Sequence, residues 1–380
     1  MASRLPSAPP VLAGYTFIRP LGTGGFADVF LFEQNMPKRS VAVKVLLQDI
    51  VDNDVLRMFN AEADVMARLS SHPSILTVYD ASISADGRPY LVMEFCPSSH
   101  SDVFRREVVS VVDVLNVAVK IACALETAHR SGVLHRDIKP SNILNTSFGA
   151  PVLADFGIAT SLRSTQQEEL FAMSVPWSAP EVVQETTTGT VQTEVWALGA
   201  TIYSLLAGRS PFETTDGVRS SRQQLRQRIV RAKYTPIGRA DVPPALEQVL
   251  ARAMSRDPAA RQSSLLEFAE NVRRVQYDMG ISPTALEVAV DEWAAAGAPI
   301  DFGNSAVRGP VISEVAVASP RSVRRPGASA VRASTHEGTF HVDAERGRTG
   351  FGLRLALVVA GGLVVGVGAT VGVLALVGVL

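Results

Sequence analysis

The sequence has 380 residues and a formal net charge of −1, and 47% of its residues are hydrophobic. This length and composition allow one large two-lobed domain with appendages, while the near-neutral charge argues against a general nucleic-acid binder, which would carry a basic excess. The two cysteines, Cys96 and Cys123, have no metal-ligating neighbours at short spacing, so we expect no disulfide framework and a reducing compartment.

The first folded region, residues 14–95, is predicted to be β-rich around one helix. Short runs of β-branched and aromatic residues predict strands, and a glycine-rich turn separates the first two. A helix is predicted over 54–69, where apolar residues recur at helical spacing. The predicted strands lie at 15–18, 29–32, 41–46 and 90–93.

The following region, residues 98–275, is predicted to be mainly helical. Val114, Ala118, Ile121 and Leu125 form one apolar stripe, and residues 195–206 are apolar on nearly every side, which indicates a buried helix. The pattern predicts an α+β protein with a small β-rich lobe and a larger α-helical lobe that meet near residues 95–100.

Flanking segments are predicted at both ends of this domain. Residues 1–13 form an N-terminal tail without the apolar run of a signal peptide. Residues 276–352 are predicted to be a linker, and its part 300–350 is rich in Ala, Ser, Gly, Pro and Arg, which is typical of a flexible segment. Ser282-Pro283 followed by an apolar pattern predicts one short helix over 283–296 within this linker.

The last segment, residues 353–380, is predicted to be a transmembrane helix. No charged residue occurs between Leu355 and Leu380, and a helix of this length would span about 39 Å, more than a hydrocarbon core of about 30 Å. The alternative is a buried core helix, but such helices rarely run so long without a polar face. Arginines at 346, 348 and 354 precede the segment, which predicts a single-pass, tail-anchored protein of the cell membrane with its N-terminal side in the cytoplasm.

The most informative motif is His-Arg-Asp-Ile-Lys-Pro-Ser-Asn at residues 135–142, followed by Asp-Phe-Gly at 155–157. It resembles the catalytic loop and metal-binding motif of protein kinases, in the serine/threonine-type variant. The resemblance implies that Asp137 is the catalytic base and that Lys139 neutralises the transferred phosphate. It also implies that Asn142 and Asp155 hold Mg²⁺.

Residues 22–29, Gly-Thr-Gly-Gly-Phe-Ala-Asp-Val, lie between two predicted strands, where a kinase has its phosphate-covering loop. A dinucleotide-binding motif would need a helix here, so that interpretation is excluded. The family's third glycine is Ala27 in this chain, and we expect a modest effect on loop flexibility. With Met93 behind the adenine, the resemblance places ATP against Leu21, Gly22, Thr23, Gly24, Gly25, Phe26, Val29, Ala42, Lys44, Glu62, Glu94 and Cys96.

Within this set, Lys44 would pair with the α- and β-phosphates, and Glu62 on the predicted helix would hold Lys44 in an ion pair. A single Lys or Glu is usually a surface charge. The order of the motifs makes the functional interpretation stronger, because lysine on a buried strand is followed by glutamate on the next helix and by Asp137 and Asp155 downstream.

Further positions refine the resemblance. His135 is expected to pack near the catalytic loop rather than act as a general base. Arg136 is expected to receive a phosphate from the activation segment, where Ser164 and Thr165 are the candidate phosphorylation sites. Ser174 lies where the family has a threonine that contacts the catalytic aspartate and lysine.

Two more positions belong to the helical lobe. Ala179-Pro180-Glu181 closes the activation segment, and Arg261 is placed like the buried ion-pair partner of Glu181. Glu194 stands where an aspartate is expected to brace the backbone of the catalytic loop, so its extra methylene is expected to shift that brace.

Together these motifs cover residues 14–270 and resemble a bacterial eukaryotic-like (Hanks-type) serine/threonine kinase, with ATP and Mg²⁺ as cofactors and protein Ser/Thr hydroxyls as acceptors. Autophosphorylation is expected, and glycine pairs at 362/366 and 368/372 leave a homodimer open. Three alternatives remain: a pseudokinase scaffold, a small-molecule phosphotransferase of the same fold, and a transmembrane receptor.

Overall fold

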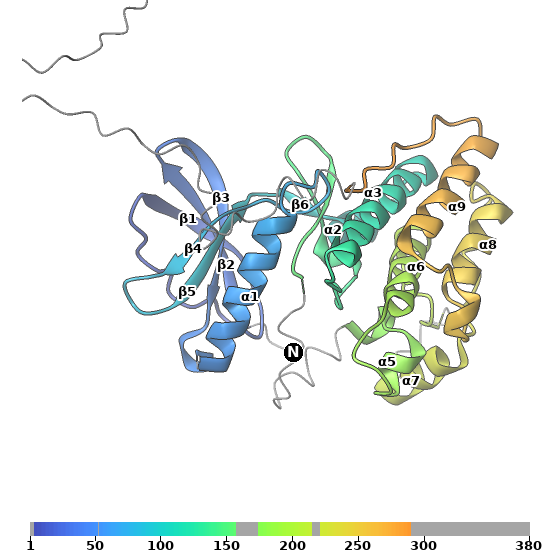
Figure 1. Cartoon of the computed structure of the whole chain (residues 1–380), viewed down its shortest axis with the longest axis horizontal. Helices are drawn as coiled ribbons and strands as arrows, with labels where there is room; N and C mark the ends of the chain where they lie inside the picture. Colours follow the sequence, from blue (N-terminus) through green and yellow to red (C-terminus); the bar gives the residue numbers. More distant parts are fainter. Residues whose placement is uncertain (1–3, 52, 157–173, 215–220, 290–380) are drawn as a thin grey trace, which may run out of the picture. The chain divides into compact units, whose positions relative to one another are not determined.

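The structure is a computed structural model that describes residues 4–51, 53–156, 174–214 and 221–289. All of these residues belong to one unit, Met1–Asp301. Its N-terminal part is a β-sheet with one long helix, and its C-terminal part is mainly helical (Figure 1).

The N-terminal lobe is built on a five-stranded antiparallel sheet in the order β1-β2-β3-β5-β4. Helix α1 packs against β4 and β5. Successive side chains of a strand point to opposite faces, so β2 contributes to two cores. The elements are β1 (Tyr15–Thr23), β2 (Ala27–Asn35), β3 (Lys38–Leu46), α1 (Asn53–Leu69), β4 (Val78–Ile83) and β5 (Pro89–Glu94).

The two faces of this sheet have different neighbours. On one face, Phe30, Phe32 and Val43 form a small apolar cluster together with Leu12 from the segment before β1. On the other face, Ala42 and its neighbours join the main core of the unit, which continues into the helical lobe. The main core therefore lies on the face of the sheet that also carries Lys44.

The helical lobe is organised around α3 and α6, which pack against each other and against α9 and α8. Helix α6 is apolar on nearly all sides and buries Trp196 and Tyr203 completely. It starts at a capping box of Thr190 and Thr193, and it ends at Gly208, whose φ of 69° suits a residue without a Cβ. The helices are α2 (His100–Arg106), α3 (Val111–Arg130), α5 (Pro180–Val183), α6 (Val191–Ala207), α7 (Arg222–Arg231), α8 (Pro244–Ala253) and α9 (Leu265–Asp278).

A second, three-stranded sheet positions the catalytic loop. It consists of β6 (Ser98–Ser99), β7 (Ile143–Asn145) and β8 (Pro151–Leu153). Strand β7 begins directly after Asn142, and β8 ends two residues before Asp155. The backbone of Leu153 also bonds Ser74 and Leu76, in the loop after α1. This sheet therefore holds both predicted metal-binding residues close to the N-terminal lobe.

These features confirm the predicted β-rich lobe and helical lobe, and the predicted buried helix over 195–206 is the central part of α6. The predicted short helix over 283–296 differs from the structure, because residues 283–289 are irregular and the rest of the range lies outside the described residues. The backbone here bonds other elements instead of itself: Thr284 N donates to Gln276, and Ala289 N donates to Thr127.

In the described ranges, no helix is long and apolar enough to cross a membrane. The predicted transmembrane helix at 353–380 lies outside these ranges, as do Ser164 and Thr165.

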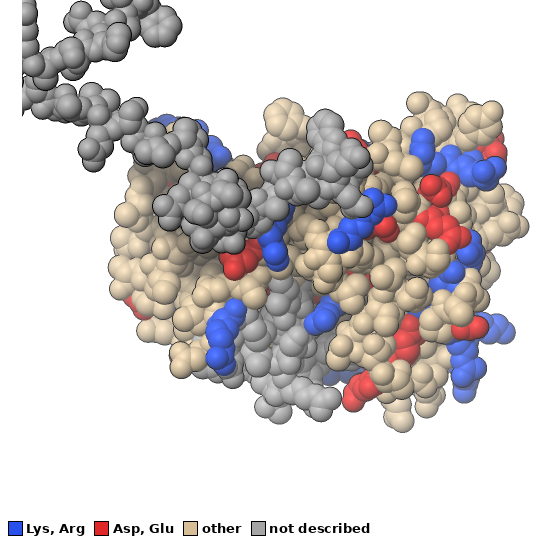
Figure 2. Space-filling view, in the orientation of Figure 1, with Lys and Arg blue, Asp and Glu red and all other residues tan. Residues whose placement is uncertain are grey.

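On the face of the Met1–Asp301 unit shown in Figure 2, basic and acidic side chains are interspersed over the helical lobe.

Candidate active site

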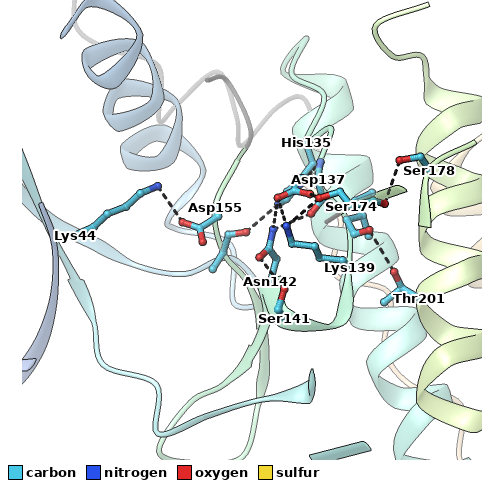
Figure 3. Close-up of polar contacts among 12 residues, drawn as sticks. Lys44, His135, Asp137, Lys139, Ser141, Asn142, Asp155, Ser174, Ser178 and Thr201 are labelled. Atoms are coloured by element: carbon cyan, nitrogen blue, oxygen red, sulfur yellow. Dashed lines mark hydrogen bonds and ion pairs between the residues drawn. The ribbon is translucent and has the colours of Figure 1, made fainter. Parts of the chain in front are cut away.

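The first part of the site is a chain of charges that links the two lobes. Lys44 on β3 places its Nζ 3.0 Å from Oε1 of Glu62 on α1 and 3.1 Å from Oδ1 of Asp155. Figure 3 shows the Lys44 side chain directed at Asp155. In the sequence, Glu62 lies 18 positions and Asp155 lies 111 positions after Lys44, and the fold brings the three residues together.

The electrostatics of this group favour the ionised forms of Lys44 and Asp155. Burial on its own would lower the pKa of Lys44, but the carboxylates of Asp155 and Glu62 outweigh it and raise that pKa above its usual value. The Lys44 charge, in turn, lowers the pKa of Asp155. A lysine fixed in this way presents a permanent positive charge for anionic groups such as phosphates.

The second part of the site is a hydrogen-bonded cluster around Asp137 (Figure 3). Lys139 Nζ lies 2.7 Å from Asp137 Oδ2, and the Ser174 hydroxyl donates to Asp137 Oδ1 at 2.6 Å. Lys139 Nζ also donates to the Ser174 hydroxyl oxygen at 3.1 Å. Asn142 completes the cluster, because its Nδ2 donates to the backbone oxygen of Asp137 at 2.8 Å and to Oδ2 at 3.0 Å.

This cluster confirms that Ser174 contacts both Asp137 and Lys139. The carboxylate of Asp137 is fixed from three directions, and its side chain keeps 22% of its surface accessible. A carboxylate fixed in this way is oriented toward an incoming hydroxyl group. A cavity of about 40 Å³, bordered by Asp137, Ser174 and Ser178, adjoins it.

His135 lies beneath the loop and is completely buried. Its Nε2 donates to the backbone oxygen of Ala154 at 3.0 Å, and its Nδ1 accepts from the backbone N–H of Asp137 at 3.2 Å. Its ring also contacts Phe156, with ring centroids 4.7 Å apart. Both ring nitrogens are therefore used to join the two motifs, as expected for a structural role.

One residue of the catalytic loop and one of the Asp-Phe-Gly motif adopt a backbone conformation that is unusual for residues with a Cβ. Arg136 has a φ of 65° and Asp155 a φ of 58°. Such strain of about 1–3 kcal/mol is kept only where surrounding contacts enforce it, and it is concentrated at functional sites. Here the contact for Arg136 is explicit, because its backbone N–H donates to Glu194 Oε1 at 2.7 Å.

Glu194 braces the loop as predicted for this position, and its extra methylene has a visible consequence. While Oε1 accepts from Arg136, Oε2 lies 2.6 Å from Nε2 of His129, in the last turn of α3. Glu194 is 2% exposed, so both contacts form in a dry environment. The longer side chain therefore joins α6, α3 and the catalytic loop at one point.

The closing ion pair of the segment after Ser174 is also present. Arg261 is 2% exposed and bonds both carboxylate oxygens of Glu181, at 2.6 and 3.0 Å. The guanidinium also donates to the backbone oxygens of Gln192 and Ser255, at 2.9 Å each. A bidentate pair with further hydrogen bonds satisfies a buried guanidinium, so it fixes where the segment ends.

The predicted ATP-contacting residues lie around Lys44. Thr23 pairs with Asp28 and Gly22 with Val29, so the phosphate loop is a hairpin turn closed by a 2.8 Å bond from Gly24 N to Ala27 O. Val29 lies opposite Lys44, and Ala42 lies opposite Met93 in the adjacent strand pair. The other predicted contacts are placed by the same elements: Leu21 and Gly22 by β1, Gly25 and Phe26 by the turn, Glu94 by the end of β5 and Cys96 by the segment after it.

Asn142 and Asp155 have donor atoms that suit Mg²⁺. Because Nδ2 of Asn142 is hydrogen-bonded to Asp137, the amide oxygen is the atom that would face a metal ion, and Asp155 would contribute a half-exposed carboxylate. Mg²⁺ is usually bound by one or two such oxygens together with substrate phosphates and water. Within the described ranges, no group of three or more His, Cys, Asp and Glu residues could hold a metal ion by itself.

Sequence reasoning missed two contributors to the site. His129 was not singled out, although a histidine in the last turn of a predicted helix just before the catalytic motif was a usable signal. The segment before β1 was assigned as a tail, yet Arg4 pairs with Asp28 beside the phosphate loop. That contact has no local sequence pattern, because the two residues are 24 positions apart.

Comparison with known proteins agrees with this geometry. The family model for the protein kinase domain matches residues 15–277. The chain is 37% identical over 292 residues to the serine/threonine-protein kinase PknK of Mycobacterium tuberculosis, a match that covers 76% of this chain and 26% of PknK. It is 31% identical over 265 residues to the serine/threonine-protein kinase PrkC of Bacillus subtilis, covering 68% of this chain and 40% of PrkC.

The chain thus spans about a quarter of PknK and less than half of PrkC, and in both comparisons the larger part of this chain is matched. The match of the family model extends across both lobes and includes every residue of the Asp137 cluster and of the Lys44 charge chain. The chain therefore belongs to the protein kinase family, as a Hanks-type serine/threonine kinase of the bacterial kind.

Proposed function

We propose that this chain transfers the γ-phosphoryl group of ATP to serine and threonine hydroxyls of proteins. The observation that carries the proposal is the cluster in which Asp137 is held by Lys139, Asn142 and Ser174. In phosphoryl transfer, the protein contributes mainly positioning and charge neutralisation. This cluster supplies both. In the N-terminal lobe, Lys44 already pairs with Asp155.

Each residue has a distinct task in this proposal. Asp137 accepts or orients the proton of the acceptor hydroxyl, and Lys139 neutralises charge that develops on the transferred phosphate. Lys44, fixed by Glu62, holds the α- and β-phosphates of ATP. Asn142 and Asp155 would hold Mg²⁺, which would supply positive charge that neutralises the phosphates.

Ser174 favours a protein acceptor over a small metabolite. Its hydroxyl joins Asp137 and Lys139, and its backbone oxygen accepts from the Ser178 hydroxyl at 3.1 Å. The segment from Ser174 to Glu181 is thereby fixed at both ends, at the catalytic loop and at Arg261. A fixed platform beside the base supports an extended peptide, whereas a metabolite needs an enclosed pocket.

The proposal is tested by offering the full chain, with Mg²⁺ and labelled ATP, a generic protein substrate, a Ser/Thr peptide library and a panel of metabolites that carry hydroxyl or amino groups. We expect label on Ser and Thr of protein or peptide, and on the chain itself. Mass spectrometry would locate autophosphorylation, with Ser164 and Thr165 as the proposed sites. Label on metabolites alone would support the phosphotransferase alternative, and nucleotide binding without any transfer would support a pseudokinase.

We also propose that residues 353–380 anchor the chain in the cell membrane, with the kinase domain in the cytoplasm. The uncharged run from Leu355 to Leu380 and the arginines before it support this proposal. The glycine pairs in this run leave open a homodimer through the membrane segment. Anchoring would confine phosphorylation to substrates that come to the membrane surface.

A further inference from the structure

The segment before β1 begins at the phosphate loop, where Arg4 lies, and reaches the apolar cluster of the sheet at Leu12. Arg4 forms an ion pair with Asp28, the second residue of β2, and also donates to the backbone oxygen of Gly24 at 3.3 Å. Gly24 is part of the turn that the ATP phosphates would meet. One side chain therefore contacts both the tip of the loop and the strand that leaves it.

A second set of contacts holds the same segment in place. The backbone N–H of Ser7 donates to Asp28 Oδ2 at 2.7 Å. From the turn between β4 and β5, Arg88 donates to the Ser7 hydroxyl at 3.2 Å and to the Ala8 backbone oxygen at 2.9 Å. Four residues after Ala8, Leu12 is buried in the apolar cluster on this face of the sheet.

Asp28 is the centre of this arrangement, and its side chain is completely buried. Burial on its own would raise the pKa of Asp28, but the hydrogen bonds from Ser7 and the ion pair with Arg4 outweigh it and hold that pKa below its usual value. A buried carboxylate without such partners carries a large desolvation cost. The N-terminal segment therefore supplies the partners that Asp28 needs.

The two faces of β2 separate this contact from the nucleotide. Asp28 and Phe30 point to the face covered by the N-terminal segment, and Val29 between them points to the face of Lys44. The contacts of the segment with Asp28 are therefore on the face of β2 opposite to Lys44.

We propose that residues 4–12 form a latch and that Arg4 and Asp28 are positioning residues for the phosphate loop, an inference that rests on the proposed use of ATP. The latch holds the hairpin turn in the position in which its backbone N–H groups approach the phosphate oxygens. Because Ala27 replaces the third glycine of the loop pattern, the turn has two glycines at its tip and one alanine at its base. The latch contacts the tip at Gly24 and the base at Asp28, next to Ala27.

The test compares four full-length variants with the wild type: Arg4→Met and Asp28→Asn, which break the ion pair, Arg4→Lys, which keeps a charge, and Lys38→Met as the matched control. Lys38, the first residue of β3, pairs with Glu33 on β2 at 3.3 Å, at the end of the β2–β3 hairpin that is remote from the turn that holds Gly24. For each protein, one measures the Kd of a non-hydrolysable ATP analogue with Mg²⁺ by calorimetry, KM for ATP, kcat with saturating peptide, and the melting temperature.

We expect Arg4→Met and Asp28→Asn to raise Kd and KM for ATP roughly three- to tenfold, with kcat within about twofold, as for the loss of one charge-assisted contact. Arg4→Lys should recover most of the affinity, and Lys38→Met should match the wild type. Unchanged nucleotide affinity in both ion-pair variants would overturn the latch. It would also be overturned if Lys38→Met lost as much nucleotide affinity as they do and the loss in each variant followed its drop in melting temperature. If the wild type transfers no phosphate, the proposed function fails, whereas the calorimetric Kd still tests the latch.

Discussion

At the residue scale, Glu194 shows how one methylene changes what a buried carboxylate can join. Its two oxygens reach Arg136 N at 2.7 Å and His129 Nε2 at 2.6 Å, and these partners belong to different elements. A shorter side chain at the same backbone position cannot keep both contacts without moving α6. Glu194 thus couples its brace on Arg136, whose backbone is left-handed, to its contact with His129 on α3.

We therefore expect Glu194→Asp to lower the free energy of unfolding by about 1–3 kcal/mol, because one buried charged hydrogen bond is lost. Chemical denaturation measures this change, and kcat should fall with it, since the catalytic loop loses its brace. Glu185→Asp is the matched control, because that side chain is 75% exposed. Equal stability of Glu194→Asp and the wild type would show that the two contacts are not coupled through the side-chain length.

The two cysteines provide a second residue-scale test. Burial raises the pKa of Cys96 to about 12, and the nearby carboxylate of Glu94 adds to the shift. At pH 8 the thiol is almost entirely protonated, so we expect alkylation by iodoacetamide roughly 10- to 100-fold slower than for the same cysteine in the urea-unfolded chain. Peptide mass spectrometry distinguishes Cys96 from Cys123. Alkylation of folded Cys96 at the unfolded rate would contradict the structure around the end of β5.

At the element scale, α6 and α8 approach each other closely because of Gly199. A Cβ built on Gly199 would lie 2.8 Å from Cβ of Ala253, which is shorter than real side chains allow. We expect Gly199→Ala to destabilise the domain by about 1–3 kcal/mol through overpacking, despite the better helix propensity of alanine. Thermal unfolding gives the measurement.

The control for this prediction is the double variant with Ala253→Gly, which removes the atom that the new methyl group would meet. We expect the double variant to be more stable than the sum of the two single changes predicts. Additive losses would mean that the two helices do not touch at this point.

The elements of this domain differ in how strongly the local sequence signals them. The strands around the phosphate loop, the long helices and the Asp137 cluster were predicted, because their signals are periodic or are motifs of fixed spacing. Residues 4–12 and 281–289 were not, because their contacts join positions that are far apart in the sequence, as Arg4 and Asp28 are. His72 Nε2, for example, donates to the backbone oxygen of Glu287 at 2.6 Å, 215 positions away. No local pattern encodes such a contact.

At the scale of the whole molecule, the proposed anchor would make the chain a membrane-bound kinase. We expect the full chain to sediment with membranes and to resist extraction at alkaline pH, whereas a chain ending at residue 352 should stay in the supernatant. Val365→Arg should weaken insertion by about 2.5–3.5 kcal/mol, and Val365→Leu should not. Alkaline extraction of the full chain would contradict an integral anchor.

Asp137 is the proposed catalytic base of the whole molecule, and the most direct test of this role separates nucleotide binding from phosphate transfer. The measurement is the single-turnover rate of phosphate transfer to a peptide, with nucleotide Kd measured in parallel, for the wild type, Asp137→Asn and the exposed control Asp80→Asn. We predict that Asp137→Asn binds Mg-ATP within about threefold of the wild type and transfers phosphate at least about 100-fold more slowly, as expected for loss of a general base. Transfer by Asp137→Asn at the rate of Asp80→Asn and the wild type would contradict the assignment of Asp137.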